Sequence, residues 1–408
     1  MIKKNPRGHA ISTGLTIVIK IGTSSICDEV THLPRLSNLS LLVETVLTLK
    51  QAGHHVVLVT SGAVGVGMRR LNLEERPKQL SKLQAVAAVG QGRLMSLYDD
   101  LFNQFSQPIA QILLTRNDVV NRTAYINAKN TVKELLEMGV VPIVNENDTV
   151  SVSEIRFGDN DTLSAITAGM INADYLFLLT DVDCLYTDNP RINPAAVAVT
   201  LVEDIEALRN KVSVSSSGSA IGTGGMFTKL IAAELATAAG VTCVICRGST
   251  PQFISSIIAY HSSTADEASA TAPTVPLHTL FVAKQNPMVD RKWWILHGVH
   301  TAGTIFIDEG AMRAITNRQR SSLFAAGIVG VEGTFVADQA VRVAIRMRRA
   351  EDGTEEIVEV GKGLVNYSSM EVSRIRGCKS SQIAELLGYA DAESVIHRNN
   401  LVITMKQL

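Results

Sequence analysis

The 408-residue chain has only five cysteines, no apolar run long enough to span a membrane and a net charge of −1. Five is an odd number, and the irregular spacing is typical of free thiols in a reducing compartment. No uninterrupted apolar segment reaches the roughly 18 residues that a membrane helix needs, and no signal-peptide hydrophobic region follows the basic start. A nearly neutral charge argues against a protein built mainly to hold nucleic acid or a membrane surface. We therefore expect a soluble, cytoplasmic protein.

Common nucleotide-binding fingerprints and zinc-binding spacings are also missing. The sequence has no G-x-x-x-x-G-K-[ST] and no G-x-G-x-x-G after a strand, so nothing supports a P-loop or a Rossmann site. Protein-kinase signatures are absent too. The single C-x-x-C, from Cys243 to Cys246, lies in a strand-like run, where residues three apart point to opposite faces. The nine histidines are scattered, so we expect no structural zinc.

What the chain does contain is a regular alternation up to about residue 260. Short β-branched runs alternate with longer amphipathic segments, which indicates βαβ units on a mainly parallel sheet. The expected strands are Thr16–Ile21, His55–Val59, Ile109–Leu114, Val140–Val144, Tyr175–Leu179 and Val241–Cys246. The expected helices are Leu39–Gln51, Leu80–Phe105, Ala124–Met138, Thr162–Ile171 and Met226–Ala239. This pattern predicts an α/β fold, a three-layer α/β/α sandwich over residues 14–260.

After residue 260 the composition changes twice. Small polar residues dominate from His261 to Thr274, so we expect a linker over residues 261–287. Short alternating strands follow, separated by Gly and Asp turns, and predict a small β-rich, barrel-like domain over residues 288–390. Its expected strands are Trp293–Leu296, Gly303–Ile307, Val329–Val331, Val341–Met347 and Ile357–Val360, and its expected helices are Glu309–Asn317 and Ser380–Leu387.

The most informative stretch runs from Asn145 to Asp161. A buried-strand pattern, Val141 to Val144, leads into it, and it closes with Asp159-Asn160-Asp161 before an apolar helical pattern. Asp and Asn are also preferred helix caps. A cap needs one such residue, however, and these seventeen positions hold eight acids or amides. Because strands of open α/β sheets deliver ligand-binding residues from their carboxyl ends, we interpret the stretch as part of an active site.

Glycine-bearing turns follow three segments of the same domain. Lys20 precedes Gly22-Thr-Ser-Ser25, a second turn runs from Val59 to Gly67, and a third, Gly222–Lys229, leads into a helix. Lysine in the first turn of a helix opposes the helix dipole unless an anion compensates it. Two lysines on separate glycine-rich turns, with an Asp-rich centre, suit phosphoryl transfer, because the lysines neutralise charge on the transferred group.

Six motifs occur in a fixed order along the chain: I-K-I-G-T-S, V-T-S-G-A, I-V-N-E-N-D, F-G-D-N-D-x-L-S-A, L-L-T-D-x-x-x-L-Y-T-x-N-P and G-T-G-G-M-x-T-K. In this combination the chain resembles the glutamate 5-kinases of the amino-acid kinase superfamily, from about Thr16 to Ile403. Its C-terminal part resembles the PUA module that many members carry, through Asp290 to Ile295, Asp308 to Ala311 and Gly361 to Tyr367.

That resemblance implies an enzyme that transfers phosphate from ATP to the side-chain carboxylate of L-glutamate. The product is L-glutamyl 5-phosphate, in the first step of proline biosynthesis. The implied catalytic residues are Lys20, Asp161 and Lys229, with Asp161 organising the lysines. The residues implied to bind ATP are Lys20, Thr180, Asp181, Thr223, Gly224, Gly225, Met226 and Lys229, and those implied to bind glutamate are Ser61, Asp148 and Asn160. The carboxylate nucleophile is already ionised at pH 7, so no general base is needed.

The resemblance also implies partners. Mg²⁺ would accompany ATP, although the sequence does not indicate its ligands. Proline would act as a feedback inhibitor at or beside the glutamate site, around Ser151 to Asp159, and the chain would form a homo-oligomer. No aldehyde-dehydrogenase-like region follows the kinase motifs, so a separate glutamyl-phosphate reductase would consume the product. Ser213 to Ala220 follows no family pattern, which leaves the loop over ATP undefined.

Two alternatives stay open at this point. Another amino-acid kinase, acting on acetylglutamate or aspartate, would share the superfamily motifs, but Asp148 and Asn160 argue against it. An RNA-binding protein is the other, since PUA modules also occur in RNA-modifying enzymes, and Val341 to Arg349 is a basic, strand-like stripe. Residues 277–408 carry a net charge of only +2 (16 basic, 14 acidic) and few aromatics for base stacking, so we do not expect RNA binding.

Overall fold

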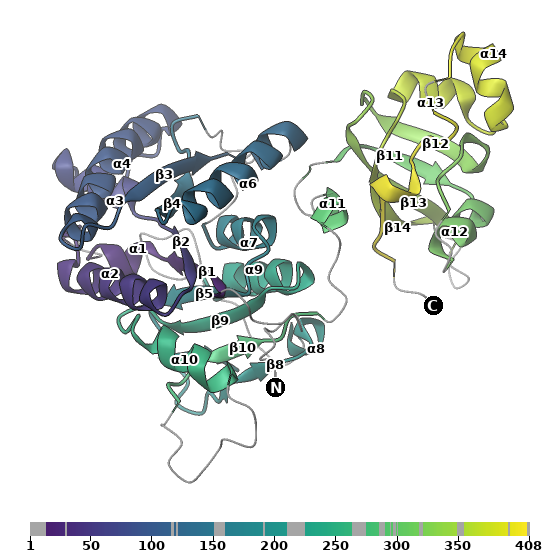
Figure 1. The fold of residues 1–408 in the computed structure, drawn as a ribbon. Helices are drawn as coiled ribbons and strands as arrows, with labels where there is room; N and C mark the ends of the chain where they lie inside the picture. The colour runs from purple at the N-terminus through teal and green to yellow at the C-terminus, as the bar shows by residue number, and fades with distance from the viewer. Residues whose placement is uncertain are drawn as a thin grey trace. The chain divides into compact units, whose positions relative to one another are not determined.

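The computed structural model divides into two compact units, Met1–Pro287 and Met288–Leu408 (Figure 1). The residues it describes are 14–28, 31–115, 118–119, 121–150, 160–190, 192–209, 225–262, 275–284, 290–293, 295–296, 299, 301–317, 321–348, 355–390 and 392–405. No helix among them combines the length and the apolar character needed to cross a membrane.

The first unit is built on a mainly parallel sheet, as the alternating pattern predicted. In spatial order its eight described strands are β3 (Ile109–Leu114), β4 (Val141–Glu146), β2 (His55–Val59), β1 (Thr16–Ile21), β5 (Tyr175–Thr180), β9 (Thr242–Arg247), β10 (Thr279–Phe281) and β8 (Leu201–Val202). The first six run parallel to one another, and β10 pairs antiparallel with β9. The predicted strands agree with these bounds to within two residues.

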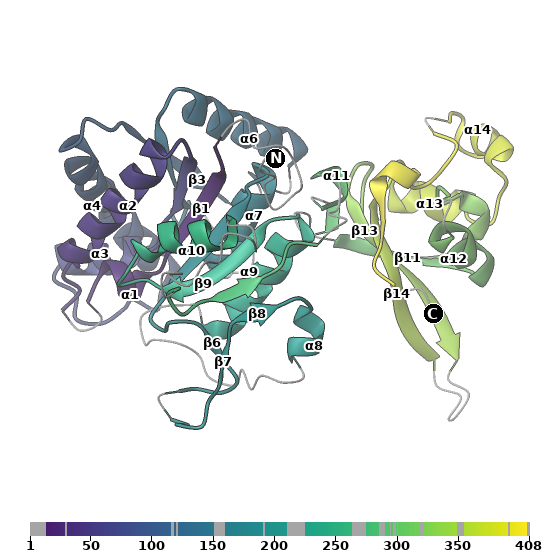
Figure 2. The same cartoon turned by 60° about the horizontal axis from the view of Figure 1, so that its bottom comes forward.

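Helices cover both faces of this sheet and complete the three layers (Figures 1 and 2). One face packs against α2 (Leu36–Gln51), α4 (Leu80–Asn103) and α10 (Phe253–Ser262), whose apolar residues share a core with Ile17, Ile19 and Ile21 of β1. The other face carries α6 (Arg122–Glu137), α7 (Asn160–Met170) and α9 (Met226–Ala238). Because side chains alternate along a strand, Val18 and Lys20 of β1 face this second layer.

Two glycines bring α3 (Ala63–Arg70) against α4. A Cβ on Gly67 would lie 2.0 Å from the carbonyl oxygen of Val86, and one on Gly90 would lie 1.7 Å from that of Ala63. Neither position can accept a side chain without moving a backbone. Gly67, in the second glycine-bearing turn, therefore serves helix packing, whereas Gly62 adopts a left-handed backbone with φ of 99° just before α3.

The first unit also contains short elements that were not predicted from the sequence. The structure adds α1 (Thr23–Ile26), the strand pair β6 (Leu185–Tyr186) and β7 (Ala198–Val199), and α8 (Ile205–Arg209). Part of the predicted linker, residues 261–287, is not a linker, because β10 lies in the sheet between β9 and β8. The excess of small polar residues, on which the linker prediction rested, ends at residue 274, and Thr279 and Phe281 beyond it are buried.

The second unit is small and β-rich, as predicted. Its five described strands are, in spatial order, β12 (Ile328–Gly333), β11 (Thr301–Ile307), β13 (Ala340–Arg348), β14 (Glu355–Leu364) and β15 (Leu401–Ile403), and its helices are α11 (Asp290–Trp293), α12 (Glu309–Thr316), α13 (Ser369–Ile375) and α14 (Ile383–Leu387). Short 3₁₀ turns cover Ala325–Gly327, Ser380–Gln382 and Arg398–Asn400. β15 extends this unit beyond the predicted end at residue 390, because it pairs with β14.

One predicted strand of this unit is wrong. Trp293–Leu296 is helical where described: Trp293 ends α11, and Ile295 and Leu296 form a helical turn. Trp293 and Ile295 are nonetheless fully buried. A short apolar run buries equally well as a strand or as a helical turn, so its periodicity could not decide between them.

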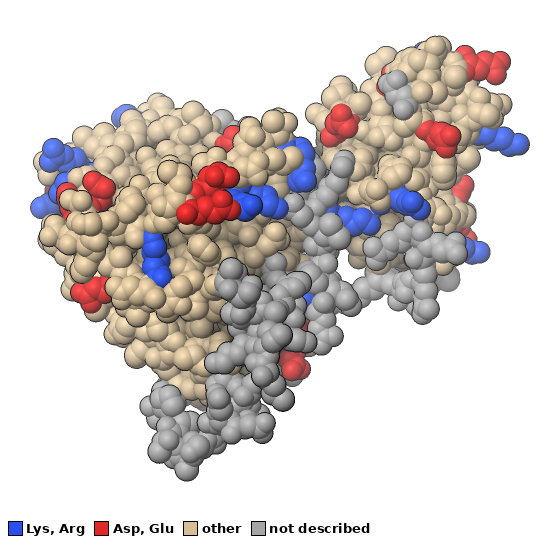
Figure 3. All heavy atoms as spheres, in the orientation of Figure 1, with Lys and Arg blue, Asp and Glu red and all other residues tan. Residues whose placement is uncertain are grey.

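Charge on the described surface is mixed in sign. The face shown in Figure 3 carries basic and acidic side chains in small scattered groups. In the second unit, Arg346 contacts Glu332 at 3.1 Å, and Arg342 contacts Glu359 at 3.7 Å. Arg342 and Arg346 of β13 are therefore each paired with an acid, Arg342 with one from the adjacent β14 and Arg346 with one from β12.

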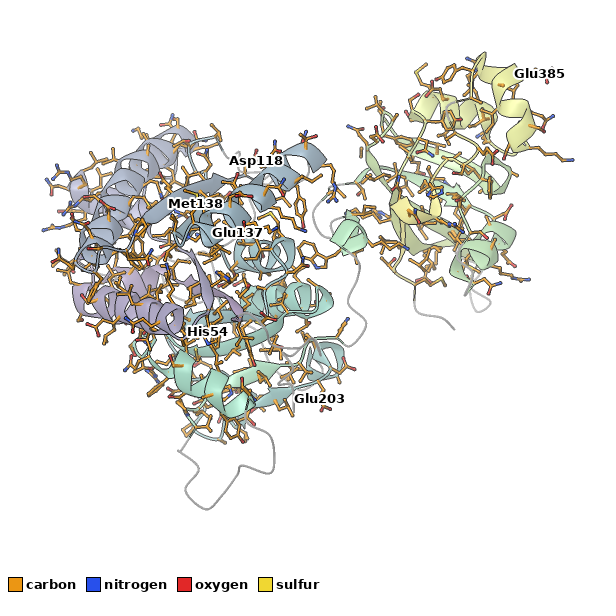
Figure 4. The ribbon with its side chains drawn as sticks, viewed as in Figure 1. His54, Asp118, Glu137, Met138, Glu203 and Glu385 are labelled. Carbon is orange, nitrogen blue, oxygen red and sulfur yellow. The ribbon has the colours of Figure 1, made fainter. Side chains whose placement is uncertain are left out.

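His54, labelled in Figure 4, accepts a hydrogen bond that protonation of its ring would break. The backbone N–H of Leu15 donates to His54 Nδ1 at 3.1 Å, so this nitrogen must be unprotonated. Burial lowers the pKa of His54; nearby Asp174 raises it and His55 lowers it further. The unfolded chain, whose histidine pKa is about 6.5, therefore binds the proton more readily. The stability that His54 contributes is present above that pH and is lost as the pH falls through the lower folded-state pKa.

We expect the urea midpoint of the wild-type chain to fall faster between about pH 8 and about pH 5 than that of His54→Asn. Asparagine keeps an acceptor oxygen at the δ position and does not titrate, so it isolates the histidine from the carboxylates that also respond to acid. Parallel midpoints for the two chains across this range would show that His54 is not the responsible group.

Candidate active site

The carboxyl ends of four neighbouring strands place polar residues at one edge of the sheet. Lys20 lies near the end of β1, Ser61 follows β2, Asn145 lies near the end of β4 and Thr180 ends β5. The chain leaves β4 on one side of β1 and, through α7, enters β5 on the other side. This is a switch point of the sheet, the place where open α/β folds bind ligands. The first residue of α7 is Asn160.

Three charged residues meet at this point. Asp161 is completely buried; its Oδ1 lies 2.6 Å from Nζ of Lys20, and its Oδ2 lies 3.2 Å from Nζ of Lys229. The two lysine side chains are only 7–8% exposed. Lys20 comes from β1 and Lys229 from α9, which packs beside α7 (Figures 1 and 2). The predicted catalytic residues thus come together from three elements.

The protonation state of this group follows from its surroundings. Burial by itself would raise the pKa of Asp161, but the charges of Lys20 and Lys229, with hydrogen bonds from Lys20 and Thr228, hold that pKa well below its usual value. Asp161 is therefore ionised at neutral pH. Two ammonium groups thus meet at one carboxylate in a nearly buried place, an arrangement that suits the binding of an anion.

Thr228 links this group to the start of α9. Its hydroxyl donates to Asp161 Oδ2 at 2.8 Å, and its oxygen accepts from the backbone N–H of Gly225 at 3.1 Å. The resemblance implies a nucleotide-binding loop that includes Thr228 but no contact between Thr228 and Asp161; the position of Thr228 directly before Lys229 in the G-T-G-G-M-x-T-K motif was the available signal. Lys229 lies in the first turn of α9, where its charge is repelled by the positive end of the helix dipole. The negative charge of Asp161 offsets part of this repulsion.

A second group of polar residues lies at the head of α7. Asn160 Nδ2 donates to Ser61 Oγ at 2.9 Å and to Asn145 Oδ1 at 3.1 Å. The structure thus joins two of the residues predicted to bind glutamate. The third, Asp148, lies half-buried in the turn after β4. Asn145 belongs to the polar stretch that follows the strand pattern, but its contact with Asn160 is a long-range one that the local pattern does not predict.

The described residues predicted to bind ATP lie on β1 (Lys20), at the end of β5 (Thr180 and Asp181) and at the start of α9 (Gly225, Met226 and Lys229). Thr180 Oγ1 donates to Asp181 Oδ1 at 3.1 Å, and both residues border a cavity of about 660 Å³ that Ser24, Ser25 and Arg247 also line. Gly225 and Met226 begin α9. Thr223 and Gly224 lie outside the described residues, as do Ser213–Ala220 and Ser151–Asp159.

Comparisons with known proteins agree with this geometry. Residues 15–247 match the amino acid kinase family, and residues 303–387 match the PUA domain. The chain is 55% identical over 400 residues to a probable glutamate 5-kinase of Schizosaccharomyces pombe, covering 98% of this chain and 96% of that protein. It is 48% identical over 388 residues to a glutamate 5-kinase of Rippkaea orientalis, covering 95% and 99%.

Among solved structures, a carbamate kinase of Giardia lamblia bound to AMP-PNP is 18% identical, with a TM-score of 0.47, over 67% of this chain and 100% of that one. Sequence identity of about half over nearly the full length decides the family. The chain therefore belongs to the amino acid kinase family, among the glutamate 5-kinases that carry a C-terminal PUA domain.

Proposed function

We propose that this protein transfers the γ-phosphoryl group of ATP to the side-chain carboxylate of L-glutamate and so catalyses the first step of proline biosynthesis. The observation that carries the proposal is the buried contact of Asp161 with both Lys20 and Lys229. Two preorganised cations in a site largely shielded from water suit a reaction in which negative charge spreads over a transferred group. The identity to glutamate 5-kinases supports glutamate as the acceptor.

In the proposed reaction a glutamate carboxylate oxygen attacks the γ-phosphorus. A new carboxylate O–P bond forms, the P–O bond to the β-phosphate breaks, and ADP leaves with the electron pair. The attacking carboxylate is ionised at pH 7, so no residue has to remove a proton. The obstacle is repulsion between two anions, which Lys20 and Lys229 reduce by placing their ammonium groups at the phosphates. Asp161 keeps the two lysines at fixed positions.

Mg²⁺ is expected to arrive with ATP. Among the described residues, no group of three or more His, Cys, Asp or Glu could hold a metal ion. Mg²⁺ in phosphoryl-transfer enzymes is bound mainly by substrate phosphates, waters and one or two carboxylates, so the nucleotide would supply most of its ligands. When bound, the ion neutralises phosphate charge alongside the lysines.

The product provides the most specific test. An acyl phosphate reacts with hydroxylamine to give a hydroxamate, whereas the product of ATP hydrolysis does not. We expect hydroxamate to form only when the protein, MgATP and glutamate are all present, in step with ADP. Release of ADP without hydroxamate would show that water, not a carboxylate, is the acceptor, and the proposed function would fail.

Ser61→Ala and Asp148→Ala are expected to raise the KM for glutamate by roughly 10- to 150-fold, the effect of losing a hydrogen bond to a charged group. The KM for ATP should stay unchanged, because both residues are assigned to the glutamate rather than to the nucleotide. Ser96→Ala, which removes an exposed hydroxyl on α4, is the matched control. A shift in the KM for ATP alone would place Ser61 and Asp148 at the wrong ligand.

We further propose that proline inhibits the enzyme at or beside the glutamate site, near residues 151–159. Proline shares the α-carboxylate and the amine nitrogen of glutamate but lacks the carboxylate that attacks ATP. It is expected to raise the KM for glutamate and to leave kcat unchanged, and Glu154→Ala should weaken this effect while keeping activity. Inhibition that saturating glutamate cannot overcome would show that proline binds elsewhere.

A further inference from the structure

A chain of side-chain amides connects α4 to the head of α7. Asn145 Nδ2 donates to Gln91 Oε1 at 2.8 Å, and Asn160 Nδ2 donates to Asn145 Oδ1 at 3.1 Å. Gln91 comes from the middle of α4, 54 positions before Asn145. Asn145, the central member, is 1% exposed. Hydrogen bonds in such a buried place hold their geometry, because water cannot replace them.

One backbone group sets the direction of every hydrogen bond in this chain. The backbone N–H of Glu146 donates to the side chain of Asn145 at 2.9 Å. A backbone N–H cannot accept, so the atom that faces it must be the amide oxygen of Asn145. The amino group of Asn145 therefore points to Gln91, which accepts. Asn160 must then turn its own amino group toward Asn145.

This orientation leaves Asn160 Oδ1 as an acceptor for a ligand. That oxygen is buried and has no hydrogen-bond partner among the described residues. The same Asn160 amino group donates to Ser61 Oγ at 2.9 Å, so Ser61 keeps its own hydroxyl proton to donate. An acceptor thus lies beside a donor. An α-amino acid carries a donor, its ammonium, and an acceptor, its carboxylate, on one carbon. The ammonium can donate to Asn160 Oδ1 while the carboxylate accepts from the Ser61 hydroxyl.

We infer that Gln91 and Asn145 are positioning residues that hold Asn160 with its oxygen toward the ligand, so that the site selects a substrate with a free α-ammonium group. The inference rests on the proposed phosphorylation of glutamate and deepens it. If Asn160 flipped, its amino group would face the ammonium, donor against donor. A substrate without the ammonium leaves Asn160 Oδ1 desolvated and unpaired, a cost that such sites use for discrimination.

The test replaces Gln91 and compares two substrates. Gln91→Leu and Gln91→Met remove the acceptor oxygen, while Gln91→Glu keeps one. We expect the first two variants to raise the KM for glutamate roughly 5- to 150-fold, with kcat and the KM for ATP unchanged. The preference for glutamate over glutarate, which lacks the ammonium group, should fall by a similar factor. Gln91→Glu should keep both properties close to the wild type.

Controls separate a positioning role from a general loss of structure. Gln104→Leu makes the same change on an exposed residue next to the end of α4, and should leave all constants as they are. Gln91→Met matches glutamine in length, so it decides the question if Gln91→Leu does not fold. A change in stability alone cannot alter the preference between glutamate and glutarate.

The outcomes distinguish the inference from the proposed function. A wild-type chain that makes no acyl phosphate from glutamate would refute the proposed function, and the inference with it. A wild-type chain that does so, together with folded Gln91→Leu and Gln91→Met variants that keep the KM for glutamate and the preference over glutarate, would overturn the inference alone.

Discussion

Lys20→Ala and Lys229→Ala are each expected to lower kcat by about 100-fold or more, the scale of removing one preorganised electrostatic group. Both ammonium groups lie against Asp161 in a place that is almost closed to water, so no solvent cation can replace either of them. Their charge matters most when the transferred phosphoryl group carries its largest negative charge. The KM for glutamate should therefore change far less than kcat.

Lys133→Ala is the matched control for these two changes. Lys133 also contacts an acid, Glu137 at 3.5 Å, but on the exposed surface of α6, where its side chain is 70% accessible. Exposed pairs of this kind contribute little to stability, so kcat and the melting temperature should both stay close to the wild type. A Lys20→Ala or Lys229→Ala enzyme with a nearly normal kcat would remove that lysine from the proposed mechanism.

Asp161→Asn is expected to damage both activity and stability. The amide keeps an oxygen for the Thr228 hydroxyl but carries no charge, so two nearly buried ammonium groups lose their common partner. Breaking a buried ion pair from one side costs about 3–5 kcal/mol of unfolding free energy. The kcat should fall about 100-fold or more, because the lysines are no longer held at the phosphates.

Melting curves and ADP release, measured on the same preparations, check this prediction. Thr228→Val is the control, since it removes the hydroxyl and leaves all three charges. We expect it to lower the free energy of unfolding by about 1 kcal/mol. The Asp161→Asn variant should still unfold cooperatively, because the apolar core on the α2 and α4 face of the sheet does not include Asp161. An Asp161→Asn enzyme with wild-type kcat would contradict the assigned role.

The sequence predicted the parts of this protein that depend on local patterns. Lys20 and Lys229 were identifiable because each lies within a glycine-bearing motif next to a regular element, and the sheet order then brings them to one place. The parallel strands were predicted almost to the residue, since continuous β-branched runs bounded by turns are typical of buried strands. The strand prediction for Trp293–Leu296 was wrong because the apolar composition of this segment reflects its burial and not its secondary structure.

Contacts between distant segments could not be predicted in the same way. Gln91 lies on a long helix with no motif around it, and its hydrogen bond with Asn145, 54 positions later, forms only in the folded chain. Strand β10 follows a polar stretch and is three residues long, too short for its alternation to be recognised. In both cases tertiary packing supplied information that no window of the sequence contains.

The most direct test of the central claim is a coupled ADP-release assay with glutamate, aspartate and N-acetylglutamate in parallel, each with MgATP. The structure places a buried cationic site beside an amide oxygen that suits a free ammonium group, so we predict ADP release with glutamate alone. Aspartate has the ammonium but a shorter side chain, and N-acetylglutamate has the side chain but no ammonium. Equal or greater activity with either of these two acids would contradict the proposed function.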